Sequence, residues 1–164
     1  MNKDQTKYSD WQDINWKSVE KSVLKLQKRI YRAKKDGNQK LVKQLQRLLT
    51  NSYSAKALAI RKVTQDNRGK KTAGVDGKIA LTPTQRIRLL KELILTEKAQ
   101  PLRRIYIPKN NGETRPLSIP TIRDRAKQML LNLALEPEWE AVFEPNSYGF
   151  RKGRSCHRSE EHTS

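Results

Sequence analysis

The sequence predicts an α+β protein, made mostly of helices with one two-stranded hairpin. Apolar residues recur at spacings of three and four along most of the chain, and near Gln100 the period changes to two over two short segments. The 164 residues carry a formal net charge of +18. Because such an excess of cations repels itself, it points to a polyanionic partner.

Composition also narrows the class of protein. No apolar run reaches the length of a membrane-spanning helix, and the N-terminus lacks the apolar core of a signal peptide. We therefore expect no membrane partner. The single cysteine, Cys156, excludes an internal disulfide and fits a reducing compartment.

Residues 1–14 are polar and predict a flexible N-terminus, after which Asn15 caps a helix that runs to about Lys35. Apolar residues recur along this helix at spacings of three and four, and a cation follows each of them two residues later from Val19 on. Two residues turn a helix by about 200°, so the cations lie on the opposite face. Such a face is either merely solvated or a contact for nucleic acid. This basic stripe consists of Lys21, Lys25, Lys28, Arg32 and Lys35.

A second helix is predicted from about Gln39 to Asn51, packed on the first as an antiparallel hairpin. Ser54 is predicted to cap a third helix. In the second helix the cations are expected to point outward and the leucines inward. The outward residues are Lys40, Lys43 and Arg47, and the inward ones are Leu41, Leu45, Leu48 and Leu49.

The segment "NRGKKTAGVDG", residues 67–77, has three glycines and no apolar period, which predicts a loop. Backbone N–H groups freed by glycine can cradle a phosphate, and Lys70 and Lys71 add charge. A flexible surface loop is the alternative. It is not a Walker A loop, because no Gly-Lys-Ser/Thr occurs in it.

The later elements have clear start signals. Thr82-Pro83 opens a helix with Ile87, Leu90 and Ile94 inward. Strands are expected at about 102–109 and 114–119. Thr121 then caps a helix with Asp124 in its first turn, and Pro137 is expected to break or kink it.

The hairpin register can be argued from its apolar residues. A single core requires Ile105 and Ile107 to share a face with Leu117 and Ile119. We therefore expect 107 to pair with 117 and 105 with 119, leaving a three-residue loop around Gly112. A two-residue Asn111-Gly112 turn is the alternative.

In the favoured register Lys109 stands opposite Arg115, and like charges in that position destabilise the pair. A bound polyphosphate would relieve the conflict, because arginine offers a fork and lysine a point charge. The alternative is that both side chains bend outward into water.

At this point the chain resembles a known family. "RRIYIPKNNGETRPLSIPTIRDRAKQ" followed by "LALEPEWEAVFEPNSYGFRKGRS" resembles the first two sequence blocks of group II intron reverse transcriptases. Upstream, "INWKSVEKSVLKLQKRIYRAKKDG" and "LLTNSYSAKALAIRKVTQDNRGKKTAGVDG" resemble their N-terminal extension. The resemblance covers about residues 11–157, and its motifs occur in the family's order.

The resemblance implies a protein that helps its intron RNA to splice and copies it into DNA. Residues 15–90 would form the helical N-terminal extension, and residues 91–157 part of the fingers of a right-hand polymerase. Expected partners are intron RNA, an RNA template with DNA primer, and a dNTP in the full-length parent. The expected location is the bacterial cytoplasm or an organelle matrix.

The resemblance also implies residue roles. Lys109 and Arg115 would contact the phosphates of the incoming nucleotide. Gly74, Asp76 and Gly77 would belong to a loop over template and primer. The cations of the first two helices, with Lys70 and Lys71, would bind intron RNA.

Nucleotidyl transfer needs carboxylates that hold two metal ions. The family carries two of them in a Tyr/Phe-Ala-Asp-Asp box, and no such box occurs in this sequence. Asp76 and Asp124 belong to other motifs. We therefore expect no catalytic residue and no metal or cofactor site in this chain, with Mg²⁺ required by the full-length parent.

The last seven residues, "RSEEHTS", are expected to be an artefact. Back-translated as AGA TCG GAA GAG CAC ACG TCT, residues 158–164 resemble the start of a sequencing-library adapter. A stand-alone basic RNA-binding or splicing-assistance protein remains an alternative function. The series of motifs disfavours a third one, a ribosome- or chromatin-associated basic domain. An in-frame Ala-Asp-Asp box downstream of codon 157 would favour the reverse transcriptase over the stand-alone protein.

Overall fold

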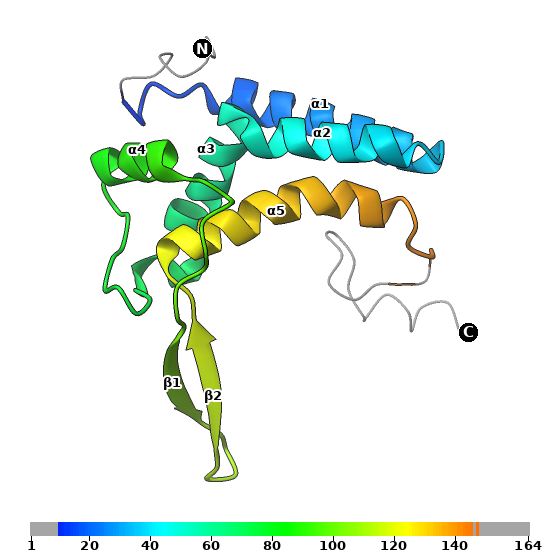
Figure 1. Cartoon of the computed structure of the whole chain (residues 1–164). Coiled ribbons are helices and arrows are strands. Elements are labelled where there is room, and N and C mark those ends of the chain that lie inside the picture. The colour runs from blue at the N-terminus through cyan, green and yellow to red at the C-terminus, as the bar shows by residue number, and fades with distance from the viewer. Residues whose placement is uncertain (1–9, 146, 148–164) are drawn as a thin grey trace, which may run out of the picture.

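The computed structural model describes residues 10–145 and 147, which form a helical body from which a β-hairpin projects (Figure 1). This arrangement confirms the predicted α+β class. No helix among these residues is long and apolar enough to cross a bilayer. The elements are α1 (Trp16–Lys35), α2 (Gln39–Asn51), α3 (Tyr53–Arg61), a π-helical turn (Lys62–Asp66), a 3₁₀ turn (Arg68–Lys71), α4 (Pro83–Glu92), β1 (Arg103–Pro108), β2 (Thr114–Ile119) and α5 (Ile122–Glu140).

Asparagine side chains cap both helices of the α1–α2 hairpin, and the first of them, Asn15, is the cap that the sequence predicts. The Asn15 side chain accepts from the backbone N–H of Ser18 at 3.1 Å, and α1 begins at the next residue. Asn38 caps α2 in the same way. Between the helices, Gly37 has a φ of 72°, a left-handed conformation that costs glycine nothing. Ser52, rather than the predicted Ser54, caps α3.

The core lies where α1, α2, α3 and α5 meet, with α4 covering one end. Trp11 and Ile14 belong to this core and are 3% and 4% exposed. The predicted flexible N-terminus is therefore wrong for these two residues. Trp11 Nε1 donates to Gln65 Oε1 at 2.9 Å, and its ring lies 5.0 Å from that of Trp16, so this short stretch is anchored to the body.

Two of the predicted inward residues lie at the surface. Leu48 is 53% exposed, while Val42 is fully buried in its place. On α2 the buried positions are Val42, Leu45 and Leu49, and Leu48 lies about 100° around the helix from Leu49. Ile94 is 49% exposed because α4 has already ended at Glu92.

The last helix passes through Pro137 without the predicted break, since α5 spans Ile122–Glu140. Proline has no N–H, so the carbonyl of Leu133, four residues earlier, loses its usual donor. Gln27 on α1 replaces it, because its Nε2 donates to Leu133 O at 2.8 Å. A hydrogen bond between helices therefore permits the proline, and the local sequence does not reveal it.

The hairpin register differs from both predicted ones. Ile107 lies opposite Arg115 and Ile105 opposite Leu117, a shift of two residues from the favoured register. Because the shift is even, every side chain keeps its predicted face. The loop of three residues, 110–112, has Gly112 at a φ of 83°, as a three-residue hairpin loop requires.

The register that forms places an attractive pair beside the turn. Lys109 lies opposite Glu113, whose carbonyl accepts from the Lys109 backbone N–H at 2.7 Å. The Lys109 ammonium also contacts the Glu113 carboxylate at 2.8 Å. An attractive pair thus replaces the predicted opposition of Lys109 and Arg115.

Candidate nucleic-acid interface

The basic stripe of α1 lies entirely at the surface. Its five predicted cations are all exposed, while Val19, Val23, Ile30 and Ala33 on the opposite face are buried. Lys17, one turn before Lys21, is exposed and extends the stripe, although it was not among the predicted cations. The stripe is therefore a continuous cationic surface on a helix that the core holds rigidly.

Large apolar side chains adjoin this stripe. Leu24 is 50% exposed and Tyr31 is 37% exposed. The Lys35 ammonium lies 5.8 Å from the centroid of the Tyr31 ring. Cations interleaved with an exposed aromatic ring suit a polyanion that also carries flat bases.

The outward cations of α2 are placed as predicted. Lys40, Lys43 and Arg47 are exposed, and Val42, Leu45 and Leu49 anchor the helix from the other side. The helices α1 and α2 run side by side across the body (Figure 1). Eight predicted RNA-binding cations thus project from two packed helices.

Glu138 of α5 fastens the α1–α2 turn to the body. Its Oε1 accepts from Lys34 Nζ at 2.9 Å and from Gln39 Nε2 at 3.1 Å, and its Oε2 accepts from Gln46 Nε2 at 2.6 Å. The Lys34 ammonium, followed by the two amides, lowers the pKa of the Glu138 carboxyl. Lys34 is therefore committed to this network and is not part of the basic stripe.

The glycine-rich loop contains a 3₁₀ turn, and two arginine side chains donate hydrogen bonds to its backbone carbonyls. Arg125 of α5 donates to the carbonyls of Gly69 (3.0 Å) and Thr72, and Arg103 of β1 donates to Ala73 O at 3.2 Å. The roles of these two arginines were not predicted from the sequence. No local signal marks them, because their acceptors are carbonyls more than 25 residues away.

Gly74 lies buried where this loop meets the start of α5. A Cβ built on it would stand 2.6 Å from Thr121 Cα and 2.7 Å from Thr121 N, closer than real Cβ contacts. Gly74 is thus required for close packing. Asp76 and Gly77 are exposed, and the Asp76 carboxylate accepts from the Lys78 N–H at 3.1 Å.

The two lysines of the loop differ in their surroundings. Lys70 is half-buried, and its Nζ donates to Gln65 O at 2.9 Å. Lys71 is exposed. Of these two lysines, Lys70 therefore donates to a backbone carbonyl, whereas for Lys71 no such bond is seen among the described residues.

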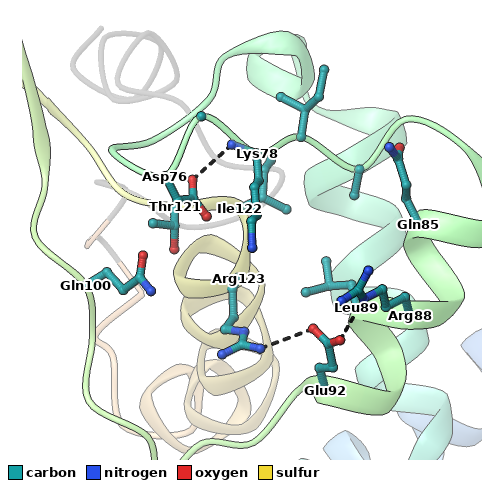
Figure 2. A pocket seen from close by; sticks show the side chains of 13 residues that line it. Asp76, Lys78, Gln85, Arg88, Leu89, Glu92, Gln100, Thr121, Ile122 and Arg123 are labelled. Atoms are coloured by element: carbon teal, nitrogen blue, oxygen red, sulfur yellow. Dashed lines mark hydrogen bonds and ion pairs between the residues drawn. The ribbon is translucent and has the colours of Figure 1, made fainter.

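A cleft of about 440 Å³ lies between residues 76–80, α4 and the start of α5 (Figure 2). Its guanidinium groups are already paired. Arg123 contacts Glu92 at 3.2 Å, and Arg88 contacts Glu92 at 2.9 Å, as the dashed lines of Figure 2 show. Arg123 also contacts Glu97 at 3.0 Å. Of these pairs, Arg123–Glu92 joins α4 to α5.

The two hairpin cations share one face near the tip of the hairpin. Lys109 and Arg115 line a shallow hollow with Pro108, Asn110 and Asn111. The side chains of Lys109 and then Asn111 lower the pKa of the Glu113 carboxyl. This ion pair is exposed to solvent, so Lys109 can exchange Glu113 for a phosphate at little cost.

The acids of the described residues do not make a metal centre. Among residues 10–145 and 147, no group of three His, Cys, Asp or Glu side chains converges. Asp124 is buried and serves the α5 cap, where it accepts from Thr121 Oγ1 at 3.0 Å and from the Gln100 N–H at 2.9 Å. Tyr148 to Arg151 and the tail 158–164 lie outside the described residues.

Comparison with known families agrees with this architecture. Residues 11–93 match the N-terminal domain of reverse transcriptase, and residues 107–164 match the reverse transcriptase (RNA-dependent DNA polymerase) family. The chain belongs to the reverse transcriptase family, and its relatives identify the group II intron reverse transcriptase/maturase type.

Three of the relatives, two from bacteria and one from Euglena, illustrate this similarity. Protein YkfC of Escherichia coli K12 is 40% identical over 126 residues, which is 72% of this chain and 32% of that protein. Maturase-like protein 1 of Euglena gracilis is 36% identical over 146 residues, 87% of this chain and 32% of that protein. Group II intron-encoded protein LtrA of Lactococcus lactis is 51% identical over 59 residues, 35% of this chain and 10% of that protein.

The chain spans about a third of the length of the first two of these relatives. Their whole-protein properties therefore enter only as proposals.

Proposed function

We propose that this chain is the N-terminal part of an intron-encoded reverse transcriptase and maturase, and that it binds intron RNA through the α1 stripe and the outward cations of α2. The observation that carries this is the exposure of all eight cations on helices fixed by a buried core. Phosphate contacts of this kind give affinity that is independent of sequence and depends strongly on salt. The expected location is the bacterial cytoplasm or an organelle matrix.

The salt dependence of RNA binding tests this proposal. The double variant Lys25→Gln/Lys28→Gln should lower the slope of log affinity against log salt by about 2, since each lost phosphate contact lowers it by about 1. The affinity at about 0.1 M salt should fall about 10- to 100-fold. Fluorescence anisotropy with a labelled group II intron RNA measures both quantities.

A matched control removes the same charge elsewhere. Lys91→Gln/Lys98→Gln also deletes two exposed cations, but these lie on α4 and in the segment that follows it. This variant should keep the wild-type slope within about half a unit. Equal losses in both double variants would mean that net charge, and not the stripe, governs binding.

We further propose that Lys109 and Arg115 bind the triphosphate of the incoming nucleotide in the full-length parent, where carboxylates of later segments would hold the Mg²⁺ ions. Their shared face and the hollow between them support this. The exposed Asp76–Gly77 turn would contact template and primer, and Gly74 would serve this loop by permitting its close approach to α5.

The nucleotide role can be measured in a completed enzyme. Lys109→Gln or Arg115→Gln should lower kcat/KM for dNTP by about 10- to 100-fold, the cost of a lost charge-assisted hydrogen bond. RNA affinity should stay unchanged. A parallel loss of RNA affinity would reassign both cations to general electrostatics.

A further inference from the structure

The two faces of the hairpin differ in chemistry. The odd-numbered face holds Ile105, Ile107 and Leu117 together with the Lys109–Glu113 ion pair. Ile105 and Ile107 are half-buried, and Ile119, at the base, is buried. This face is therefore the more covered of the two. On the opposite face, the residue between Arg104 and Pro108 is the aromatic Tyr106.

The even-numbered face, which we call the platform, is exposed throughout. It comprises Arg104, Tyr106 and Pro108 of β1 with Thr114, Pro116 and Ser118 of β2. Tyr106 is 63% exposed, although a tyrosine ring gains free energy when it is covered. Neither strand contains an acidic residue. The hairpin projects from the helices, so the helical body leaves this face open (Figure 1).

Strand pairing brings Tyr106 and Pro116 together on the platform. The Lys109–Glu113 pair is hydrogen-bonded through Lys109 N–H, so the alternation of an antiparallel ladder makes Tyr106–Pro116 a pair without hydrogen bonds. Proline is tolerated there because no N–H is needed. Side chains are closest in such pairs. The Tyr106 ring and the Pro116 ring therefore lie next to each other.

We propose that the platform binds a single-stranded segment of nucleic acid, with one base stacked on Tyr106 and a neighbouring phosphate on Arg104. Because neither strand contains an acidic residue, the charge of the platform favours an anionic ligand. An exposed aromatic ring beside a cation matches a base followed by a phosphate. Arg103, which is adjacent in sequence, points to the other face and donates to Ala73 O, so it does not compete. This inference rests on the proposed function and adds a second surface, specific for unpaired strands.

The test uses the 164-residue chain and a fluorescein-labelled ten-nucleotide RNA without secondary structure. Tyr106→Ala should weaken its binding by about 5- to 100-fold, the range for one lost base stack, and leave the salt slope unchanged. Tyr106→Phe should bind within about twofold of wild type, because the ring is retained. Arg104→Gln should lower the salt slope by about 1.

Two further variants exclude a disrupted hairpin. Tyr106→Leu keeps an apolar partner for Pro116 but removes the aromatic ring, and it should weaken binding as much as Tyr106→Ala. Leu117→Ala alters an exposed residue of the opposite face in the same hairpin, and it should bind as wild type does. A loss in Leu117→Ala equal to that in Tyr106→Ala would overturn the platform and favour a protein partner for the hairpin.

Other outcomes separate the two proposals. If wild type binds duplex RNA through the stripe and Tyr106→Ala has no effect on single strands, the platform is wrong and the proposed function stands. If Tyr106→Ala weakens duplex and single-strand binding alike, base stacking is again excluded. If wild type binds no RNA at about 0.1 M salt, both proposals fail.

Discussion

Gly74→Ala is expected to destabilise the protein strongly. The added methyl would stand 2.6 Å from the Cα of Thr121, and the obstacle is backbone at the start of α5, which cannot rotate aside. Overpacking of this kind costs typically about 1 to 3 kcal/mol and occasionally more. We expect about 2 to 4 kcal/mol here, because the same displacement disturbs the Thr121 cap. Thermal unfolding followed by circular dichroism measures it.

The same loop offers a matched control. Gly69→Ala adds an identical methyl group, whose nearest neighbour is Nη1 of Arg125 at 3.8 Å, an ordinary contact. Its φ is not positive, so alanine is not strained there. The free energy of unfolding should change by less than about 0.5 kcal/mol. Equal Tm shifts in the two variants would contradict the packing role assigned to Gly74.

Glu138→Gln should destabilise the attachment of α1 and α2 to α5 near neutral pH. The carboxylate is 12% exposed and accepts three hydrogen bonds, one from the Lys34 ammonium. Loss of its charge leaves that ammonium without a counterion, at a cost of about 1 to 3 kcal/mol. The exposed pair partner Glu113 provides the contrast, since Glu113→Gln should leave Tm almost unchanged.

The effect of Glu138 should depend on pH in a definite direction. Its folded-state pKa is lowered, chiefly by Lys34, so its stabilisation is present above the unfolded pKa of about 4.3. It is lost as the pH falls through the folded-state pKa. The Tm difference between wild type and Glu138→Gln should therefore be constant from about pH 6 to 8 and shrink below about pH 4.5. A difference that is unchanged at low pH would exclude the carboxylate as its source.

Much of the helical framework could be predicted because its signals are local. Asn15 and Thr121 cap helices as expected, and the bounds of α2 agree with the prediction. The opposition of apolar and basic stripes on α1 follows from spacing alone. The hairpin faces agree with the prediction because the register differs from the favoured one by an even number of residues.

The remaining features depend on contacts between distant segments. The apolar pattern could not fix the register, because a shift of two residues leaves every apolar side chain on the same face. The passage of α5 through Pro137 needed Gln27, 106 residues away from Leu133 in the chain. Likewise, Gly74 reads as a flexible-loop glycine until Thr121 is placed beside it. Arg125 shows the same limit, because its acceptors are carbonyl oxygens, which every residue possesses.

The central claim is that the basic stripe of α1 and the cations of α2 bind RNA. Acetylation of surface lysines, quantified by mass spectrometry with and without a group II intron RNA, tests it without altering the protein. Lys21, Lys25, Lys28, Lys35, Lys40 and Lys43 should be protected by the RNA, while the exposed Lys91 and Lys98 should react at unchanged rates. Equal protection of all these lysines, or protection confined to Lys91 and Lys98, would contradict this claim.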